Sequence, residues 1–193
     1  MLVSIKTAAV NGLDAMEVML EVSTTKGEGF FMVGLPDSAV RESRSRVESA
    51  LLNSKCFISG NKTVVNFAPA DVRKEGTGYD LPLALALMAV SNILEPECME
   101  GCLFVGELGL DGSLRPVRGL LPVAIMARAK GYRALFVPEE NAREAAVVDR
   151  LKVYGAKHLS QVVEHLQGKS ICTCDGLSAT TTNWVMDRIL NKL

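Results

Sequence analysis

The sequence has few of the residues that mark secreted, membrane-spanning or strongly charged proteins. Its five cysteines are odd in number and irregularly spaced, which argues against the disulfide framework of a secreted domain. A net charge of -1 provides no global attraction to nucleic acid or to an anionic membrane. The longest apolar run, residues 81–94, is too short and interrupted to span a bilayer, and the N-terminus lacks the pattern of a signal peptide. We therefore expect a cytoplasmic protein.

Apolar residues, in contrast, are abundant. They make up 48% of the 193 residues, against 22% charged residues. A chain of this length and composition can bury a sizeable core and suits one domain of ordinary size.

The order of periodic segments predicts an α+β fold, in the form of a mixed α/β sandwich. Alternating apolar and polar residues flank Asn11-Gly12, which favours a hairpin. Asp37 and Asp80 each have the sequence position of a helix N-cap. The expected strands cover residues 2–9, 14–22, 30–33, 62–67, 103–108, 134–137 and 151–154, with a short one near 114. The expected helices cover 37–53, a long apolar segment from 80, 122–130, 139–148 and 159–167.

This order is lost after Gly168. We place one domain at residues 1–168 and a linker or tail at 169–193, in which residues 184–193 could form one more short helix.

A fragment of a phosphate-binding loop occurs at this boundary, in Gly168-Lys169-Ser170. The full pattern requires a glycine where Val163 stands, and a loop that follows a strand and opens a helix. Here the fragment follows a predicted helix, so we interpret it as a helix end.

Potential metal ligands are also poorly arranged. Cys98, Cys102, Cys172 and Cys174 have spacings of three residues and one residue, unlike ordinary zinc knuckles. His158 and His165 lie seven residues apart without a partner at ligand spacing, so we expect both at the surface. The sequence predicts no metal site.

One predicted helix, residues 37–53, carries three arginines that are weak candidates for nucleic-acid contact. They are Arg41, Arg44 and Arg46. Glu42 lies four residues before Arg46, and Glu48 four after Arg44, so ion pairs would neutralise much of this charge.

The most informative segments are two glycine-containing stretches that precede apolar helices. They are residues 74–82, Lys-Glu-Gly-Thr-Gly-Tyr-Asp-Leu-Pro, and residues 106–119, Gly-Glu-Leu-Gly-Leu-Asp-Gly-Ser-Leu-Arg-Pro-Val-Arg-Gly. Together they resemble the proteolytic domain of Lon. In that resemblance Gly78 occupies the position of the serine nucleophile, and Val123 falls at about the position of the lysine. Neither side chain can perform the chemistry of a Ser–Lys dyad.

A divergent peptidase is the enzymatic alternative. Thr77 would be its nucleophile and Lys74 its base, although Glu75 and Asp80 on either side of Thr77 would favour the protonated, inactive form of the lysine.

A wider resemblance covers about residues 1–168. Five blocks in order carry it, at residues 31–43, 65–76, 79–84, 106–119 and 138–145. With these blocks the chain resembles the N-terminal domain of the Mg-chelatase-like ATPases of the YifB/ComM family.

The resemblance implies a Lon-protease-like fold, shared with a ribosomal-protein and GHMP-kinase superfold, without peptidase activity. In that family the domain precedes an AAA+ module that binds ATP and Mg, the proteins form hexamers, and competence-linked members act on DNA. This chain has no Walker A motif, so we expect no cofactor and no enzymatic activity from it alone.

The resemblance thus predicts an accessory domain for oligomerisation or substrate engagement, with the AAA+ module, further copies and DNA as partners. An inactive remnant is a further alternative. The candidate residues of a partner surface or vestigial pocket are Lys74, Glu75, Thr77, Asp80 and Arg118.

Overall fold

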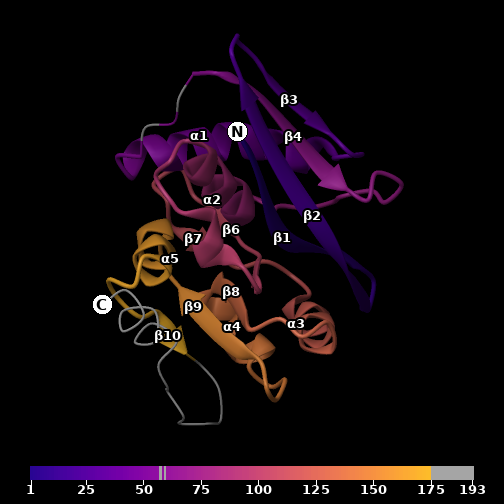
Figure 1. The fold of residues 1–193 in the computed structure, drawn as a ribbon. Helices are drawn as coiled ribbons and strands as arrows, with labels where there is room; N and C mark the ends of the chain where they lie inside the picture. The colour runs from indigo at the N-terminus through magenta and orange to yellow at the C-terminus, as the bar shows by residue number, and fades with distance from the viewer. Residues whose placement is uncertain (57, 59, 175–193) are drawn as a thin grey trace.

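The computed structural model describes residues 1–56, 58 and 60–174, and within them one mixed sheet runs through the molecule (Figure 1). The strand order is β10-β9-β8-β5-β1-β2-β4-β3. The strands are β1 (Leu2–Asn11), β2 (Asp14–Thr25), β3 (Phe30–Val33), β4 (Lys62–Ala68), β5 (Cys102–Phe104), β8 (Ala134–Pro138), β9 (Lys152–Ala156) and β10 (Thr173–Cys174). A separate small hairpin pairs β6 (Glu107–Leu108) with β7 (Leu114–Arg115).

The helices in the described part lie on both faces of this sheet. They are α1 (Ser38–Asn53), α2 (Asp80–Val90), α3 (Leu120–Ala129), α4 (Glu139–Ala145) and α5 (Leu159–Leu166), together with the 3₁₀ helix η1 (Pro96–Met99). Helices α1, α2 and α5 contribute to one core cluster, and α3 and α4 to another. The predicted mixed α/β fold is confirmed. No described helix is long and apolar enough to cross a membrane.

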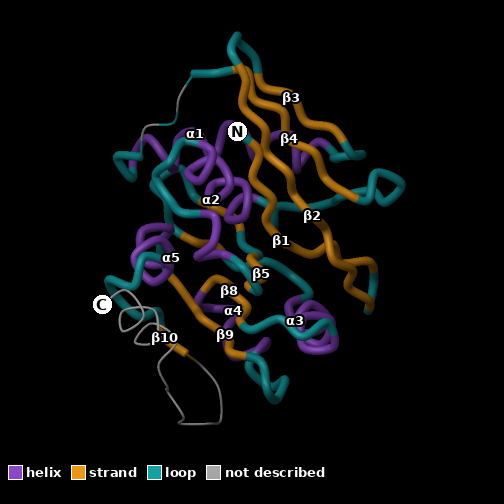
Figure 2. The backbone as a smooth tube through the Cα atoms, viewed as in Figure 1, coloured by secondary structure: helices purple, strands orange, loops and turns teal. Residues whose placement is uncertain are grey.

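The N-terminal half is built on the predicted hairpin. Strand β1 pairs antiparallel with β2, and Gly12 in the turn has φ 62°, a left-handed conformation that glycine adopts without strain. Strand β2 also pairs antiparallel with β4 on its other side. The short edge strand β3 pairs parallel with β4 (Figure 2).

The C-terminal half is the predicted βα alternation. Strands β5, β8 and β9 are parallel, and every residue of β8 is buried because helices cover both faces of the sheet there. All residues of α2 are buried as well, as its continuous apolar sequence predicts.

One expected strand differs from the structure. The segment expected to form one strand at 103–108 forms two, β5 and β6, because the chain leaves the main sheet after Phe104. Gly106 then bonds to the segment around the start of α2. Its N–H donates to Gly78 O (2.9 Å), and its carbonyl accepts from Leu81 N (3.0 Å). Beyond Gly168 the described chain continues to β10, which pairs antiparallel with β9, and the domain boundary at residue 168 stays a prediction. The expected helix at 184–193 lies outside the described residues.

Candidate functional site at the glycine loop

The glycine loop, residues 74–80, is held between the start of α1 and the small β6–β7 hairpin. Lys74 N–H donates to Leu35 O (3.1 Å), and Asp37 N–H donates to Lys74 O (3.0 Å). The Lys74 side chain is buried, and its ammonium donates to the carbonyl of Pro69. The first residue of the loop is therefore fixed by both backbone and side chain.

Asp37 has two roles in this arrangement. Its Oδ1 accepts from Val40 N–H (2.8 Å), which caps α1 as the sequence predicts. Its Oδ2 lies 3.4 Å from Gly76 N, so the same carboxylate also contacts the loop. The contact with Gly76 joins residues 39 positions apart, so no local sequence pattern predicts it.

Asp80 does not act as the predicted N-cap. Tyr79 occupies the cap position, and the Asp80 carboxylate is turned toward Arg46 of α1. Arg46 donates to it twice, from Nε (2.7 Å) and from a terminal nitrogen (3.0 Å), and Leu108 N–H adds a third bond (3.1 Å). The carboxylate thus joins α1, α2 and β6 instead of capping one helix.

This ion pair is buried on the aspartate side and nearly so on the arginine side. The side-chain exposure is 0% for Asp80 and 18% for Arg46. Burial raises the pKa of Asp80, whereas Arg46 and the Leu108 N–H act against that rise; the bonds to Asp80 in turn raise the Arg46 pKa. A bidentate guanidinium is the partner best suited to a desolvated carboxylate.

The three arginines of α1 therefore differ in availability. Arg46 is engaged by Asp80 and lies 4.0 Å from Glu42. Arg44 pairs with Glu48 (2.9 Å) and lies over the Phe30 ring (4.8 Å), while Arg41 is exposed.

The two positions that correspond to the Lon dyad lie near the same apolar cluster. A Cβ on Gly78 would lie 3.1 Å from Val105 Cγ1, a tight contact, and Val105 belongs to the cluster that contains Val123. Val123 is fully buried on α3 beside Leu120 and Ala124. Neither position therefore carries a group that could act as a nucleophile or a base.

The remaining candidate residues do not converge on one reacting centre. Glu75 is exposed and pairs with Arg73 (3.1 Å), Thr77 is half-buried, and Arg118 is exposed before α3. Burial lowers the pKa of Lys74, opposed only by Asp71. The expectation that Glu75 and Asp80 control the lysine was wrong, because these carboxylates bind Arg73 and Arg46.

The tip of the β6–β7 hairpin is pinned by helix ends that the sequence did not associate with it. Asn53 at the end of α1 donates to Leu110 O (2.7 Å). His158, the N-cap of α5, accepts from Ser160 N at Nδ1 and therefore carries its proton on Nε2, 2.9 Å from Asp111 O. Gly112, with φ 88°, leaves no room for a Cβ between His158 and Ser54.

The second histidine is not at the surface, contrary to expectation. His165 is fully buried against Tyr154 and Phe136, and its Nδ1 accepts from Cys172 N (3.0 Å). Burial lowers its pKa to about 4. Among the described residues no three His, Cys, Asp or Glu side chains form a metal-binding group.

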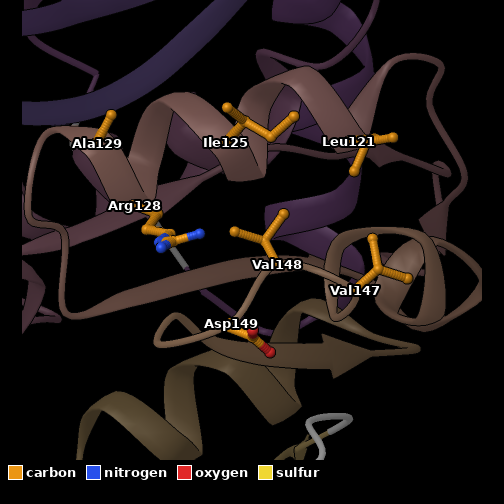
Figure 3. Close-up of a pocket in the computed structure, with 7 residues that line it drawn as sticks. All are labelled: Leu121, Ile125, Arg128, Ala129, Val147, Val148 and Asp149. Atoms are coloured by element: carbon orange, nitrogen blue, oxygen red, sulfur yellow. The ribbon is translucent and has the colours of Figure 1, made fainter.

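A second surface feature lies away from the glycine loop, between α3 and the connection from α4 to β9 (Figure 3). This α3–α4 groove has a volume of about 550 Å³ and is lined by Leu121, Ile125, Arg128, Ala129, Val147, Val148 and Asp149. This groove was not predicted from the sequence, because the exposure of one face of α3 depends on segments distant in the chain.

Comparison with known proteins identifies the scaffold on which these features lie. The family described as subunit ChlI of Mg-chelatase matches residues 20–141. The chain belongs to this family. Competence protein ComM of Haemophilus influenzae is 41% identical over 159 residues, which is 82% of this chain and 31% of ComM. YifB of Salmonella typhimurium, described as uncharacterized, is 41% identical over 166 residues, 86% of this chain and 33% of YifB.

The chain is also more distantly similar to Lon proteases. Lon protease of Bacillus thuringiensis is 26% identical over 160 residues, covering 76% of this chain and 20% of the protease. This ChlI-family chain spans about a third of the length of ComM and YifB.

Proposed function

We propose that this chain is a non-proteolytic accessory domain of a Mg-chelatase-like AAA+ ATPase, which serves oligomerisation or substrate engagement in ATP-driven DNA processing. The observation that carries the proposal is the pair Gly78 and Val123. The chain has a mixed α/β fold and a distant similarity to Lon, yet Gly78 has no side chain and Val123 is buried in the core.

The contacts of the glycine loop support a structural role for this loop. The loop is bonded to α1 through Asp37 and to α1 and β6 through Asp80. These bonds fix the backbone of the loop but bring together no nucleophile and base. A fixed loop on a folded scaffold is suited to binding a partner.

The similarity to ComM favours DNA processing within this proposal, since that relative is described as a competence protein. ATP and Mg would bind to the AAA+ module, and further copies of the domain would be its neighbours in a ring. Arg41 and Arg44 of α1 are the candidate DNA contacts on this chain, because Arg46 is committed to Asp80.

Light scattering and a DNA titration of the chain at low salt test this role. We expect a mass above the monomer or measurable DNA affinity, with an affinity that falls as salt rises. If DNA binds through α1, Arg41→Ala with Arg44→Ala weakens it, whereas Arg115→Ala on the exposed β7 does not. A strict monomer without DNA affinity contradicts the proposal.

The peptidase alternative is tested separately with a casein or peptide substrate. We expect no cleavage by either the wild-type chain or Thr77→Ala. Cleavage by the wild-type chain that Thr77→Ala abolishes would establish a divergent threonine peptidase and refute the non-proteolytic assignment.

A further inference from the structure

Helix α3 has two apolar faces, and the described residues cover only one of them. One face packs into the core through the buried residues of the helix, and the other presents Leu121 and Ile125 to the α3–α4 groove. These two side chains are 38% and 54% exposed, and Val147 across the groove is 67% exposed. A surface helix normally has a polar outer face, so this second apolar stripe marks a surface for interaction.

The groove has two apolar walls (Figure 3). One wall is α3, from which Leu121 and Ile125 project, and the other is the connection from α4 to β9, which carries Val147 and Val148. The side chains along a helix form a ridge that packs into a groove of its partner. Helix α3 thus supplies one wall of the groove and also a ridge of the kind that fills one.

Each wall also carries one exposed charge. Arg128 lies on α3, and Asp149 lies on the α4–β9 connection. Neither side chain forms a salt bridge with any other residue that the structure describes. The groove therefore presents one uncompensated charge of each sign, on opposite walls.

These charges distinguish between possible partners. A partner of one sign, such as a nucleic acid, would bring like charges together at one wall, which weakens association. A second copy of the chain carries both signs. A two-fold axis that passes between the walls places Arg128 of each copy beside Asp149 of the other.

The same rotation also matches the apolar walls. It places α3 of each copy against the α4–β9 connection of the other, so Ile125 of one copy faces Val147 of the second. A single symmetry operation therefore covers the exposed stripe of α3 and pairs both charges.

We propose that the α3–α4 groove is a two-fold, self-complementary interface between two copies of this chain. Leu121, Ile125 and Val147 form its apolar centre, and two Arg128–Asp149 pairs lie at its edge. The proposal rests on the oligomerisation part of the proposed function, because it names the face through which two copies meet. Neither the dyad positions nor α1 takes part in it.

Sedimentation of the full chain over a concentration series tests the apolar centre. Ile125→Asp places a carboxylate in the groove at an exposed position. Ile171→Asp is the matched control, because Ile171 is 62% exposed and precedes β10, which pairs with the end of β9, whereas the groove lies at the start of β9.

We expect the mass of the wild-type chain to rise toward that of a dimer with concentration. Ile125→Asp should raise the dissociation constant by ~10-fold or more, since each dimer then buries two carboxylates in apolar surroundings. Ile171→Asp should leave the dissociation constant unchanged.

Exchange of the two charges tests the symmetry. Arg128→Glu and Asp149→Lys should each weaken the dimer, because each brings like charges together twice across the two-fold axis. An equal mixture of the two variants should associate again. In a mixed pair the carboxylate introduced at position 128 meets the ammonium introduced at position 149, and the unchanged Arg128 meets the unchanged Asp149. An effect within one chain cannot produce this recovery.

A wild-type chain that stays monomeric at every concentration overturns the proposal. Self-association that Ile125→Asp leaves unchanged also overturns it, as does a mixture that remains as dissociated as its two components. DNA binding by a monomeric chain would refute this interface and leave the proposed function standing, so the two failures are distinguishable.

Discussion

At the scale of single residues, the Arg46–Asp80 pair decides how the glycine loop is held. Asp80 is fully buried and accepts three hydrogen bonds, two of them from Arg46. A buried carboxylate whose cation is removed retains its desolvation cost without compensation. This pair is therefore the most sensitive point of the candidate site.

Arg46→Ala should lower the free energy of unfolding by about 3–5 kcal/mol, the range for breaking a buried ion pair. Arg41→Ala on the same helix is the control and should change it by less than about 0.5 kcal/mol, because Arg41 is exposed. Urea denaturation of both variants measures the difference. If both variants lowered the free energy of unfolding equally, the Arg46–Asp80 pair would contribute no more than a surface ion pair.

Gly112 is the second position at which one residue controls the site. Gly112→Ala adds a methyl 2.8 Å from both His158 Nε2 and Ser54 Oγ, at φ 88°. Gly131→Ala is a matched control, with φ 76° and nothing within 4 Å of its Cβ.

Both alanines carry the left-handed backbone cost of about 1–2 kcal/mol. We expect Gly112→Ala to lose at least about 1 kcal/mol more, the size of an overpacking cost. Thermal or urea unfolding of both variants measures this difference. Equal stability of Gly112→Ala and Gly131→Ala would contradict the close packing of the hairpin tip.

At the scale of elements, the last described strand is fastened by α5. His165 accepts from Cys172 N–H, and Cys172 Sγ donates to Gln161 O (3.3 Å). Because burial lowers the pKa of His165 to about 4 from 6.5, the folded protein favours the neutral imidazole. The neutral ring is also the form whose Nδ1 can accept the hydrogen bond from Cys172 N–H.

The free energy of unfolding should decrease as pH falls from 6.5 toward 4. In this window the unfolded chain binds a proton at His165 that the folded chain does not, so the contribution present above pH 6.5 is lost, by about 3 kcal/mol at most. His165→Gln should flatten this slope in urea titrations at several pH values, whereas His158→Gln should retain it. An unchanged slope in His165→Gln would assign the pH dependence to other groups.

Another element-scale contact fixes the groove helix to the sheet. Glu17 of β2 accepts from Tyr132 Oη (2.7 Å) and Lys6 Nζ (2.8 Å), and lies 3.3 Å from Lys130 Nζ. Burial acts to raise its pKa, but these three donors lower it to about 2. The end of α3 is therefore tied to β2.

Local sequence predicted most of these elements and few of their connections. The Asn11-Gly12 turn, the Asp37 cap and the apolar periodicity of α2 each depend on residues close in the chain, and each is confirmed. The role of Asp80 was missed because its partner is Arg46, 34 residues away. The burial of His165 was missed because it depends on packing against β8 and β9.

At the scale of the whole molecule, the chain is a ChlI-family member with a mixed α/β fold and a distant similarity to Lon. The assignment of Gly78 and Val123 to the positions of the Lon dyad stays a prediction from sequence, and the structure adds that Gly78 lies in the glycine loop while Val123 is buried on α3. The α3–α4 groove could not be predicted from sequence, since an exposed apolar face on a helix appears only when its neighbours are in place.

Light scattering of the chain over a concentration series, with and without DNA at low salt, tests the central claim most directly. We expect self-association or a salt-sensitive DNA complex, together with no hydrolysis of a peptide substrate in the same samples. A monomer at every concentration that binds no DNA, or a chain that cleaves the peptide through Thr77, would contradict it.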